Sequence, residues 1–165
     1  MNVEQDLKKI AEQERRLRFA ALDLDQLWQL GMDLRAMARE RGMALAIEIR
    51  VAGQTVFCNT MPGASPNNAD WARRKRSTVE MLHTSSYAVG LEAKRKGVSL
   101  EQESGQLLRD YAIHGGSFPL LLGELGVVGA ITVSGAPERE DHALVVEALA
   151  RMLGQPHAEL AFEPL

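Results

Sequence analysis

The chain has 165 residues, of which 45% are hydrophobic, and its formal net charge is -3. This length suits one domain with a full core, and the small negative charge gives no overall attraction to nucleic acid or to an anionic membrane. No stretch approaches the roughly 18 uninterrupted apolar residues that a membrane helix needs. Because Cys58 is a lone cysteine and segment 1–20 is charged rather than apolar, we expect a cytoplasmic protein without disulfides.

The first two expected elements are amphipathic helices. The apolar stripe of the first helix consists of Leu7, Ile10, Leu17 and Ala21. The stripe of the second helix follows Asp25 and consists of Leu27, Leu30, Leu34, Met37 and Ala38. Gly42 then favours a left-handed cap. We expect one domain over residues 1–165, with a helical extension at 1–24 and a C-terminal tail at 154–165.

Two β-hairpins are expected further along. Residues 45–51 and 55–58 are rich in β-forming side chains, and Gly53 lies in the turn between them. Residues 118–122 and 127–133 form a second such pair around a glycine-containing turn.

Helices and one loop fill the remaining sequence. Residues 61–68 form a loop that ends in helix-capping side chains, and one long helix follows over residues 69–96. A short helix is expected over residues 99–111 and a closing helix over residues 138–153. The pattern predicts an α+β fold, with an antiparallel sheet of two hairpins and helices packed on it in profilin-like or PAS-like layers.

Two short motifs connect the chain to a known family. Residues 114–119 read His-Gly-Gly-Ser-Phe-Pro, and residues 133–137 read Val-Ser-Gly-Ala-Pro before Glu-Asp-His at 140–142. In this order they resemble the haem-degrading-domain family of HbpS-like and GlcG-like proteins, and most closely its UPF branch. The resemblance runs from about Leu27 to about Leu153. It implies that His114 lies near the family's proposed ligand site and that the protein forms a homo-oligomer.

His114 is the first candidate for chemistry. Its imidazole is suited to ligating a haem iron or moving a proton, while Gly115 and Gly116 let a ligand approach the backbone and Ser117 adds a hydroxyl. The alternative is structural: the glycines form a turn, His114 is a hydrogen-bonded corner residue, and Ser117 satisfies a loop amide.

A cationic run beside an aromatic residue is the second candidate. Trp71, Arg74 and Lys75 belong to a segment that suits phosphates, carboxylates or haem propionates, although such a run also suits a solvated helix turn. At about 100° per residue, Lys75 falls about 40° from Trp71, on the core side of the helix. Lys75 must therefore snorkel, form an ion pair or face an anionic ligand.

Other polar residues favour structural roles. His83 is expected to be partly buried and hydrogen-bonded, Cys58 a buried structural thiol and His157 an exposed tail residue. Asp141 lies among carboxylates that suit a helix N-terminus better than a metal site. The motifs of common hydrolases, nucleotide-binding proteins and zinc proteases are absent from the sequence.

Three functions follow from these residues. The first is a small-molecule binding protein that holds haem or another planar anionic ligand between the sheet and the long helix. The second is an oligomeric interaction or scaffold protein without a small ligand. The third is an enzyme that uses His114 in acid–base catalysis, for which no orienting carboxylate is evident. We expect no metal site and no nucleic-acid or membrane partner.

Overall fold

The computed structural model describes residues 2–164. The helices are α1 (Val3–Arg16), α2 (Leu24–Glu40), α3 (Pro66–Leu82), α4 (Ser86–Lys96), α5 (Leu100–Ser104), α6 (Glu138–Met152) and α7 (His157–Leu160). The strands are β1 (Arg18–Phe19), β2 (Ala46–Val51), β3 (Gln54–Thr60), β4 (Ser117–Leu122) and β5 (Gly126–Ser134). The predicted α+β class is confirmed.

The strands form one five-stranded sheet in the order β1-β4-β5-β2-β3. Both expected hairpins are present, and β2 joins them by pairing antiparallel with β5. The prediction of a purely antiparallel sheet is wrong, however, because β1 lies parallel to β4 with Arg18 opposite Leu121. Phe19 is buried at this edge, and its carbonyl accepts a hydrogen bond of 2.8 Å from the Gly123 N–H. A two-residue strand is too short to produce a visible alternation in the sequence.

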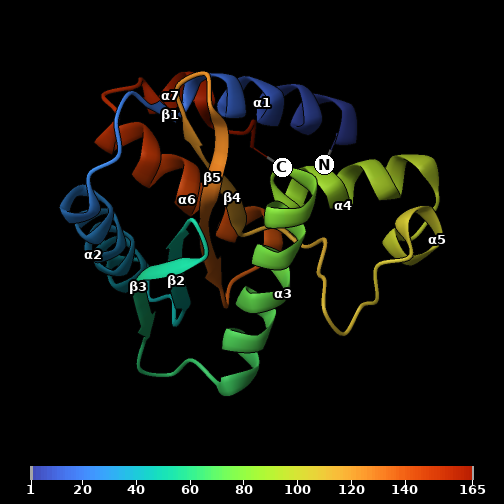
Figure 1. The fold of residues 1–165 in the computed structure, drawn as a ribbon, viewed down its shortest axis with the longest axis horizontal. Coiled ribbons are helices and arrows are strands. Elements are labelled where there is room, and N and C mark those ends of the chain that lie inside the picture. The colour runs from blue at the N-terminus through green and yellow to red at the C-terminus, as the bar shows by residue number, and fades with distance from the viewer. Residues whose placement is uncertain (1, 165) are drawn as a thin grey trace.

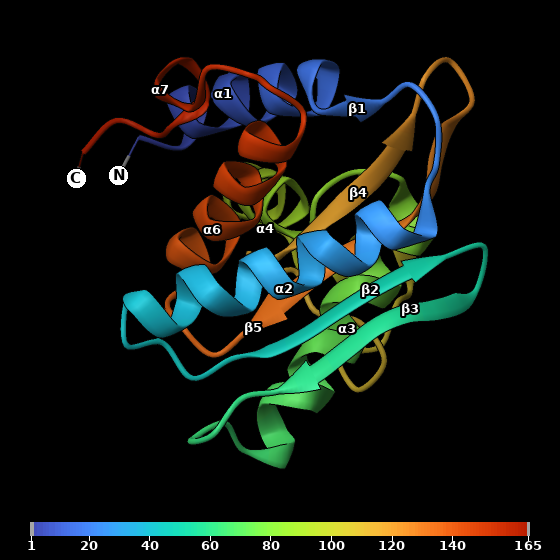
Figure 2. The ribbon, with the colours of Figure 1, turned by 90° about the vertical axis from the view of Figure 1, so that its left-hand side faces the viewer.

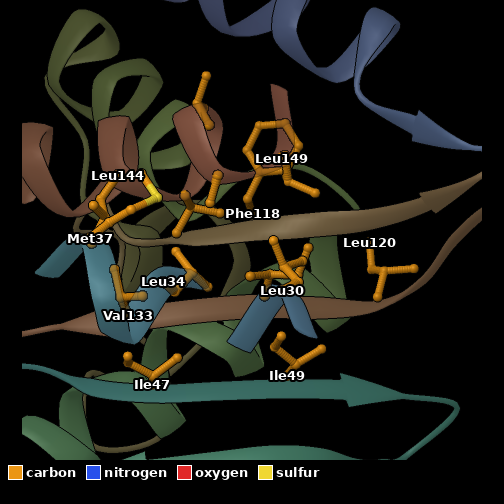
Figure 3. Packing of buried hydrophobic residues seen from close by; sticks show 14 of the residues in the cluster. Leu30, Leu34, Met37, Ile47, Ile49, Phe118, Leu120, Val133, Leu144 and Leu149 are labelled. Atoms are coloured by element: carbon orange, nitrogen blue, oxygen red, sulfur yellow. The ribbon is translucent and has the colours of Figure 1, made fainter. Parts of the chain in front are cut away.

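Helices cover both faces of the sheet (Figures 1 and 2). Helices α2 and α6 lie on one face, and α3 lies on the other. The core between the sheet and α2/α6 is apolar, as the labelled side chains in Figure 3 show. It includes Leu30, Leu34, Met37, Ile47, Ile49, Phe118, Leu120, Val133, Leu144 and Leu149. Alternate strand residues supply this face because side chains along a strand point to opposite sides.

The opposite face, against α3, is more polar. Ser117 and Thr132 are buried there, and their hydroxyl oxygens lie 2.7 Å apart. On α3, the buried hydroxyl of Thr78 donates to the Ala112 carbonyl at 2.8 Å. This face therefore depends on matched hydrogen bonds as well as on apolar burial.

The region predicted as one helix over residues 69–96 contains two helices, so that prediction is wrong. Helix α3 is capped at its C-terminal end by His83 in the left-handed conformation, with φ 58°. Ser85 then starts α4, because its side chain accepts a hydrogen bond from the Ala88 N–H at 3.3 Å. Hydroxyl side chains favour such caps over helix interiors. His83, expected to be partly buried, is exposed.

The predicted short helix over residues 99–111 is also shorter than expected. Helix α5 ends at Ser104, and Gly105 follows in the left-handed conformation with φ 71°. Its expected capping box is confirmed: the Ser99 N–H donates to Gln102 Oε1, and the Gln102 N–H donates to the Ser99 hydroxyl. The sequence indicated the start of α5 through its capping-box residues, whereas Gly105 determines its end.

The two terminal segments pack on each other. Gln13 Nε2 donates to the Leu160 carbonyl at 2.7 Å, which ties α1 to α7. Residues 2–24 include the short strand β1 as well as α1, and residues 154–164 include α7. His157, expected to be exposed, is half-buried, and Ala21, expected on the apolar stripe, is exposed beyond the end of α1.

Candidate functional site

A cleft of about 280 Å³ lies beside the first turns of α3. It is lined by Asn67, Asn68, Trp71, Lys75, His114, Ser134, Gly135, Ala136 and Glu138. These residues come from α3, from the loop before β4, from the end of β5, and from the connection to α6 and its first residue. Three of the sequence-predicted residues, Trp71, Lys75 and His114, thus meet at one place.

Trp71 and His114 form the aromatic part of the cleft. Their ring centroids are 4.8 Å apart with an interplanar angle of 78°, an edge-to-face arrangement. His114 is exposed, and within the described part of the chain its ring makes no hydrogen bond. Its imidazole nitrogens are therefore accessible to a ligand.

Arg74 supports Trp71 from outside the cleft lining. Its guanidinium lies 4.0 Å from the Trp71 ring centroid, in a cation–π arrangement. Arg74 also donates to Asp70 Oδ2 at 2.9 Å and to the Leu108 carbonyl at 3.2 Å. The same guanidinium therefore fixes the indole ring and the loop that carries Leu108.

Lys75 is the most deeply placed cation of the cleft. Its side chain is 4% exposed, and its Nζ lies 2.8 Å from Asp141 Oδ2, whose side chain is fully buried. Nζ also donates to the Val133 carbonyl at 3.3 Å. Of the alternatives for Lys75, the structure contains the ion pair.

Asp141 connects Lys75 to the backbone that borders the cleft. Its carboxylate accepts hydrogen bonds from the Gly135 N–H at 3.3 Å and the Ala136 N–H at 3.0 Å. Burial raises the pKa of Asp141, while the Lys75 ammonium and these two N–H groups oppose the increase. The expected place in the first turn of α6 is correct, but the pairing with Lys75 was not evident from the sequence.

Gly115 and Gly116 make room for the protein itself. A Cβ at Gly115 would lie 2.0 Å from the Glu138 carbonyl oxygen. A Cβ at Gly116, where φ is +125°, would lie 2.4 Å from the Val133 oxygen and 2.8 Å from Lys75 Nζ. The double glycine thus allows the loop to pass over α6 and over the Lys75 ion pair.

Ser117 does not line the cleft. Its N–H donates to the Ser86 hydroxyl at 3.1 Å, and its own hydroxyl contacts Thr132. Ser117 is therefore a structural residue, although its hydroxyl pairs with Thr132 and not with the loop amide that the structural alternative expected. Asn67, Asn68, Ser134 and Glu138 were not recognised as lining residues. The only available signal was that the asparagines resembled helix caps, and Asn68 does accept the Ser65 N–H at 2.7 Å.

His142 is buried beside the aromatic side chains of Tyr87, Phe118 and Phe162. Because Gln13 Nε2 donates to Leu160, Gln13 Oε1 accepts from His142 Nε2 at 2.9 Å. Burial lowers the pKa of His142 to about 3, so the ring is neutral near pH 7. His142 therefore holds helices together rather than facing the cleft.

Other features of the described residues bear on function. Cys58, expected to be buried, is exposed. Residues 2–164 contain no group of three His, Cys, Asp or Glu side chains placed to hold a metal ion. Among the helices described, none combines the length and apolar character required to cross a bilayer.

The fold and the cleft define a small α+β protein with one helix-covered sheet and a ligand-sized cleft. The chain belongs to the haem degrading protein HbpS-like family, whose model matches residues 22–150. A UPF0303 protein of Azotobacter vinelandii is 51% identical over 165 residues, covering 100% of this chain and 99% of the relative. Another UPF0303 protein, of Paraburkholderia phymatum, is 49% identical and covers 98% of both chains. The family inferred from the motifs is confirmed.

Solved structures share the fold at low sequence identity. The Ybr137w protein matches with a TM-score of 0.83 and 23% identity over 93% of this chain and 92% of that one. A PduOC:heme complex matches with a TM-score of 0.68 and 21% identity over 79% and 94%. HbpS matches with a TM-score of 0.63 and 20% identity over 84% and 94%. These likenesses establish the architecture.

Proposed function

We propose that this chain is a small-molecule binding protein whose ligand enters the cleft beside Trp71 and His114. The observation that carries the proposal is the meeting of an exposed imidazole, an indole edge and two asparagine side chains around one cavity. Apolar surface with a few convergent polar groups is the usual composition of ligand sites. A planar ligand suits the aromatic wall.

The charges around the cleft indicate where the acidic groups of an anionic ligand would lie. The positive charge of Lys75 is matched by Asp141, and Glu138 adds a negative charge to the lining. The proposed anionic ligand therefore places its planar body in the cleft, while its acidic groups lie toward solvent. Arg74, whose guanidinium lies 4.0 Å from the Trp71 ring centroid, is a cation available to such a group.

Haem is the candidate ligand supported by the family and by the haem in the PduOC complex. If haem binds here, the exposed His114 imidazole would hold the iron, and haem would supply its redox-active iron. A cavity of about 280 Å³ lies near the lower end of small-molecule sites, which span about 300–1,000 Å³. A tetrapyrrole would therefore insert one edge, and its propionates would stay at the surface.

A haemin titration tests this proposal. In a Trp28→Phe background, Trp71 is the remaining tryptophan, so its fluorescence reports on the cleft independently of the haem spectrum. We expect saturable quenching of Trp71 together with a Soret shift, and His114→Ala should alter the Soret band and weaken binding.

The matched control is His83→Asn, which removes another exposed histidine from a left-handed position that asparagine tolerates. Unchanged binding in His83→Asn is expected. Equal effects of the two substitutions, or no saturable signal, would contradict haem binding at His114.

A second candidate function, self-association, is favoured by one exposed surface. Helix α2 presents Leu24, Trp28 and Met32, which are 57%, 53% and 41% exposed and lie one turn apart. Light scattering should then show an oligomer that Trp28→Glu disrupts. Gln29→Glu, which adds the same charge on the neighbouring helix position, should leave it intact. A monomeric wild-type protein would exclude this function.

A further inference from the structure

A second cavity lies between the β2–β3 hairpin and α3, away from the Trp71–His114 cleft. Its volume is about 440 Å³. It is lined by Ala46, Ile47, Glu48, Arg50, Thr55, Cys58, Asn59, Thr60, Ala69, Ala72, Arg73 and Arg76. Because Ile47 and Ile49 enter the apolar core, strand alternation places Glu48 and Arg50 on the opposite face, toward α3. Alanines on the facing helix leave the space open.

The cationic residues of this cavity are not equally neutralised. Arg76 pairs with Glu48 and lies 3.5 Å from Glu80 Oε2. Arg73 lies 3.0 Å from Asp70. Arg50, by contrast, has no ion-pair partner among residues 2–164, and its terminal nitrogen donates to the carbonyl of Gly53 in the adjacent turn.

Two guanidinium nitrogens at this cavity also lack hydrogen bonds. Arg50 Nε and Arg76 Nε are buried and make no hydrogen bond in the described structure, although Arg76 Nε lies 3.5 Å from Glu80 Oε2. A buried donor without an acceptor is costly, so side chains with unused donors favour any acceptor that reaches them. The guanidinium of Arg50 thus has no counter-charge among the described residues, and its Nε has no acceptor.

We propose that this cavity binds a small molecule through a carboxylate, with the guanidinium of Arg50 as the anchoring group. Arginine presents a planar fork of donors that matches the two oxygens of a carboxylate. A guanidinium without an ion-pair partner is matched by one negative charge, and a carboxylate carries one. The nearby Glu48 carboxylate disfavours a more highly charged group such as phosphate.

Cys58 provides a reporter for this site. Residue pairing in the β2–β3 hairpin places Cys58 opposite Glu48, and therefore on the cavity face. Its thiol is exposed, and it is the one cysteine in the sequence. A molecule seated in the cavity would cover this thiol and slow its alkylation.

The experiment measures the rate of Cys58 alkylation by iodoacetamide in the presence of three probes. Sodium benzoate is the carboxylate, benzamide is its neutral counterpart of similar shape, and inorganic phosphate tests the class of anion. We expect benzoate to slow the reaction saturably, and the other two probes to leave the rate unchanged. Protection by benzamide to the same extent, protection by phosphate alone, or no protection by benzoate would overturn the proposal.

Variants then locate the anchor. Arg50→Gln should weaken the apparent benzoate affinity by about tenfold or more, as expected when a charge-assisted hydrogen bond is lost. Arg39→Gln, on the exposed surface of α2, removes the same charge elsewhere and should retain protection. Equal losses in the two variants would overturn the assignment to Arg50.

A second variant keeps the test decisive if Arg50→Gln does not fold. Ala69 lines the cavity from an exposed position on α3, so Ala69→Leu fills space without altering any charge. We expect Ala69→Leu to abolish protection by benzoate. Full protection in this variant would place benzoate outside the cavity and overturn the proposal.

Discussion

The two faces of the sheet are built from the same strands but are stabilised in different ways. Against α2 and α6, side chains such as Leu34 and Ile49 are fully buried among other apolar groups. Against α3, the buried groups include the Lys75–Asp141 ion pair and the hydroxyl of Thr78. Apolar burial tolerates approximate geometry, whereas buried polar groups require a partner at a defined distance.

The two cavities discussed above lie on the same side of the sheet. The cleft at Trp71 and the cavity at Arg50 both border α3, on the polar face. A face that already carries charged groups and backbone acceptors can recognise polar ligands, while the apolar face has its surface covered by α2 and α6. Both binding sites proposed above therefore lie on the polar side of the sheet.

The largest expected effect concerns the ion pair of the polar face. Asp141→Ala leaves the Lys75 ammonium buried without its partner, so we expect the free energy of unfolding to fall by about 3–5 kcal/mol. Urea denaturation at pH 7 measures the loss. In the double variant Lys75→Met/Asp141→Leu the stability should return to within about 2 kcal/mol of wild type. Equal losses in the single and double variants would contradict the importance of pairing.

A substitution on the apolar face provides the contrast. Leu34 is 0% exposed, so Leu34→Ala should cost about 3 kcal/mol through lost burial and a cavity. Leu24 lies on the same helix and is 57% exposed, and Leu24→Ala should change stability by about 0.5 kcal/mol or less. Thermal and urea denaturation would measure both. Similar losses in the two variants would show that α2 does not bury one face as described.

The smallest of these effects concerns His142, a buried polar side chain on the apolar side of the sheet. His142 has a pKa of about 3 in the folded protein, below the value near 6.5 of an exposed histidine. The unfolded chain therefore binds more protons between these values, and stability should fall as the pH falls from 6.5 toward 3. Between pH 6.5 and 4.5 this contribution amounts to about 2–3 kcal/mol.

Urea denaturation at several pH values measures this slope. His142→Leu removes the titrating ring, so its stability should depend less on pH in the same interval. His157→Ala, which removes a half-buried histidine from α7, is the control and should retain the wild-type slope. Identical slopes in wild type and His142→Leu would contradict a neutral buried ring.

Sequence periodicity predicted the apolar face better than the polar one. The α2 stripe, both hairpins and α6 follow from spacing alone, because apolar burial repeats with the period of the element. The break between α3 and α4 did not, since it depends on a left-handed His83 and on Ser85 as a cap. Local capping, which apolar periodicity does not report, determines that boundary.

The candidate site was predictable in part because helical spacing also places residues relative to the core. Helical spacing placed Lys75 toward the core, and the family resemblance drew attention to His114. The partner of Lys75 lies 66 positions away at Asp141, and no local pattern connects them. Similarly, the cavity at Arg50 arises from the packing of a hairpin against α3, so its residues carried no motif.

The contact between Gln13 and Leu160 has a consequence for synthesis of the protein. These residues are 147 positions apart in the chain. A ribosome adds about 5–20 residues per second, so the N-terminal helix is made roughly 7–30 s before its C-terminal partner. During that interval Ile10 and Leu17, buried in the finished protein, remain uncovered by the tail. Until the tail is made, the part of α1 that packs on α7 has no partner in the nascent chain.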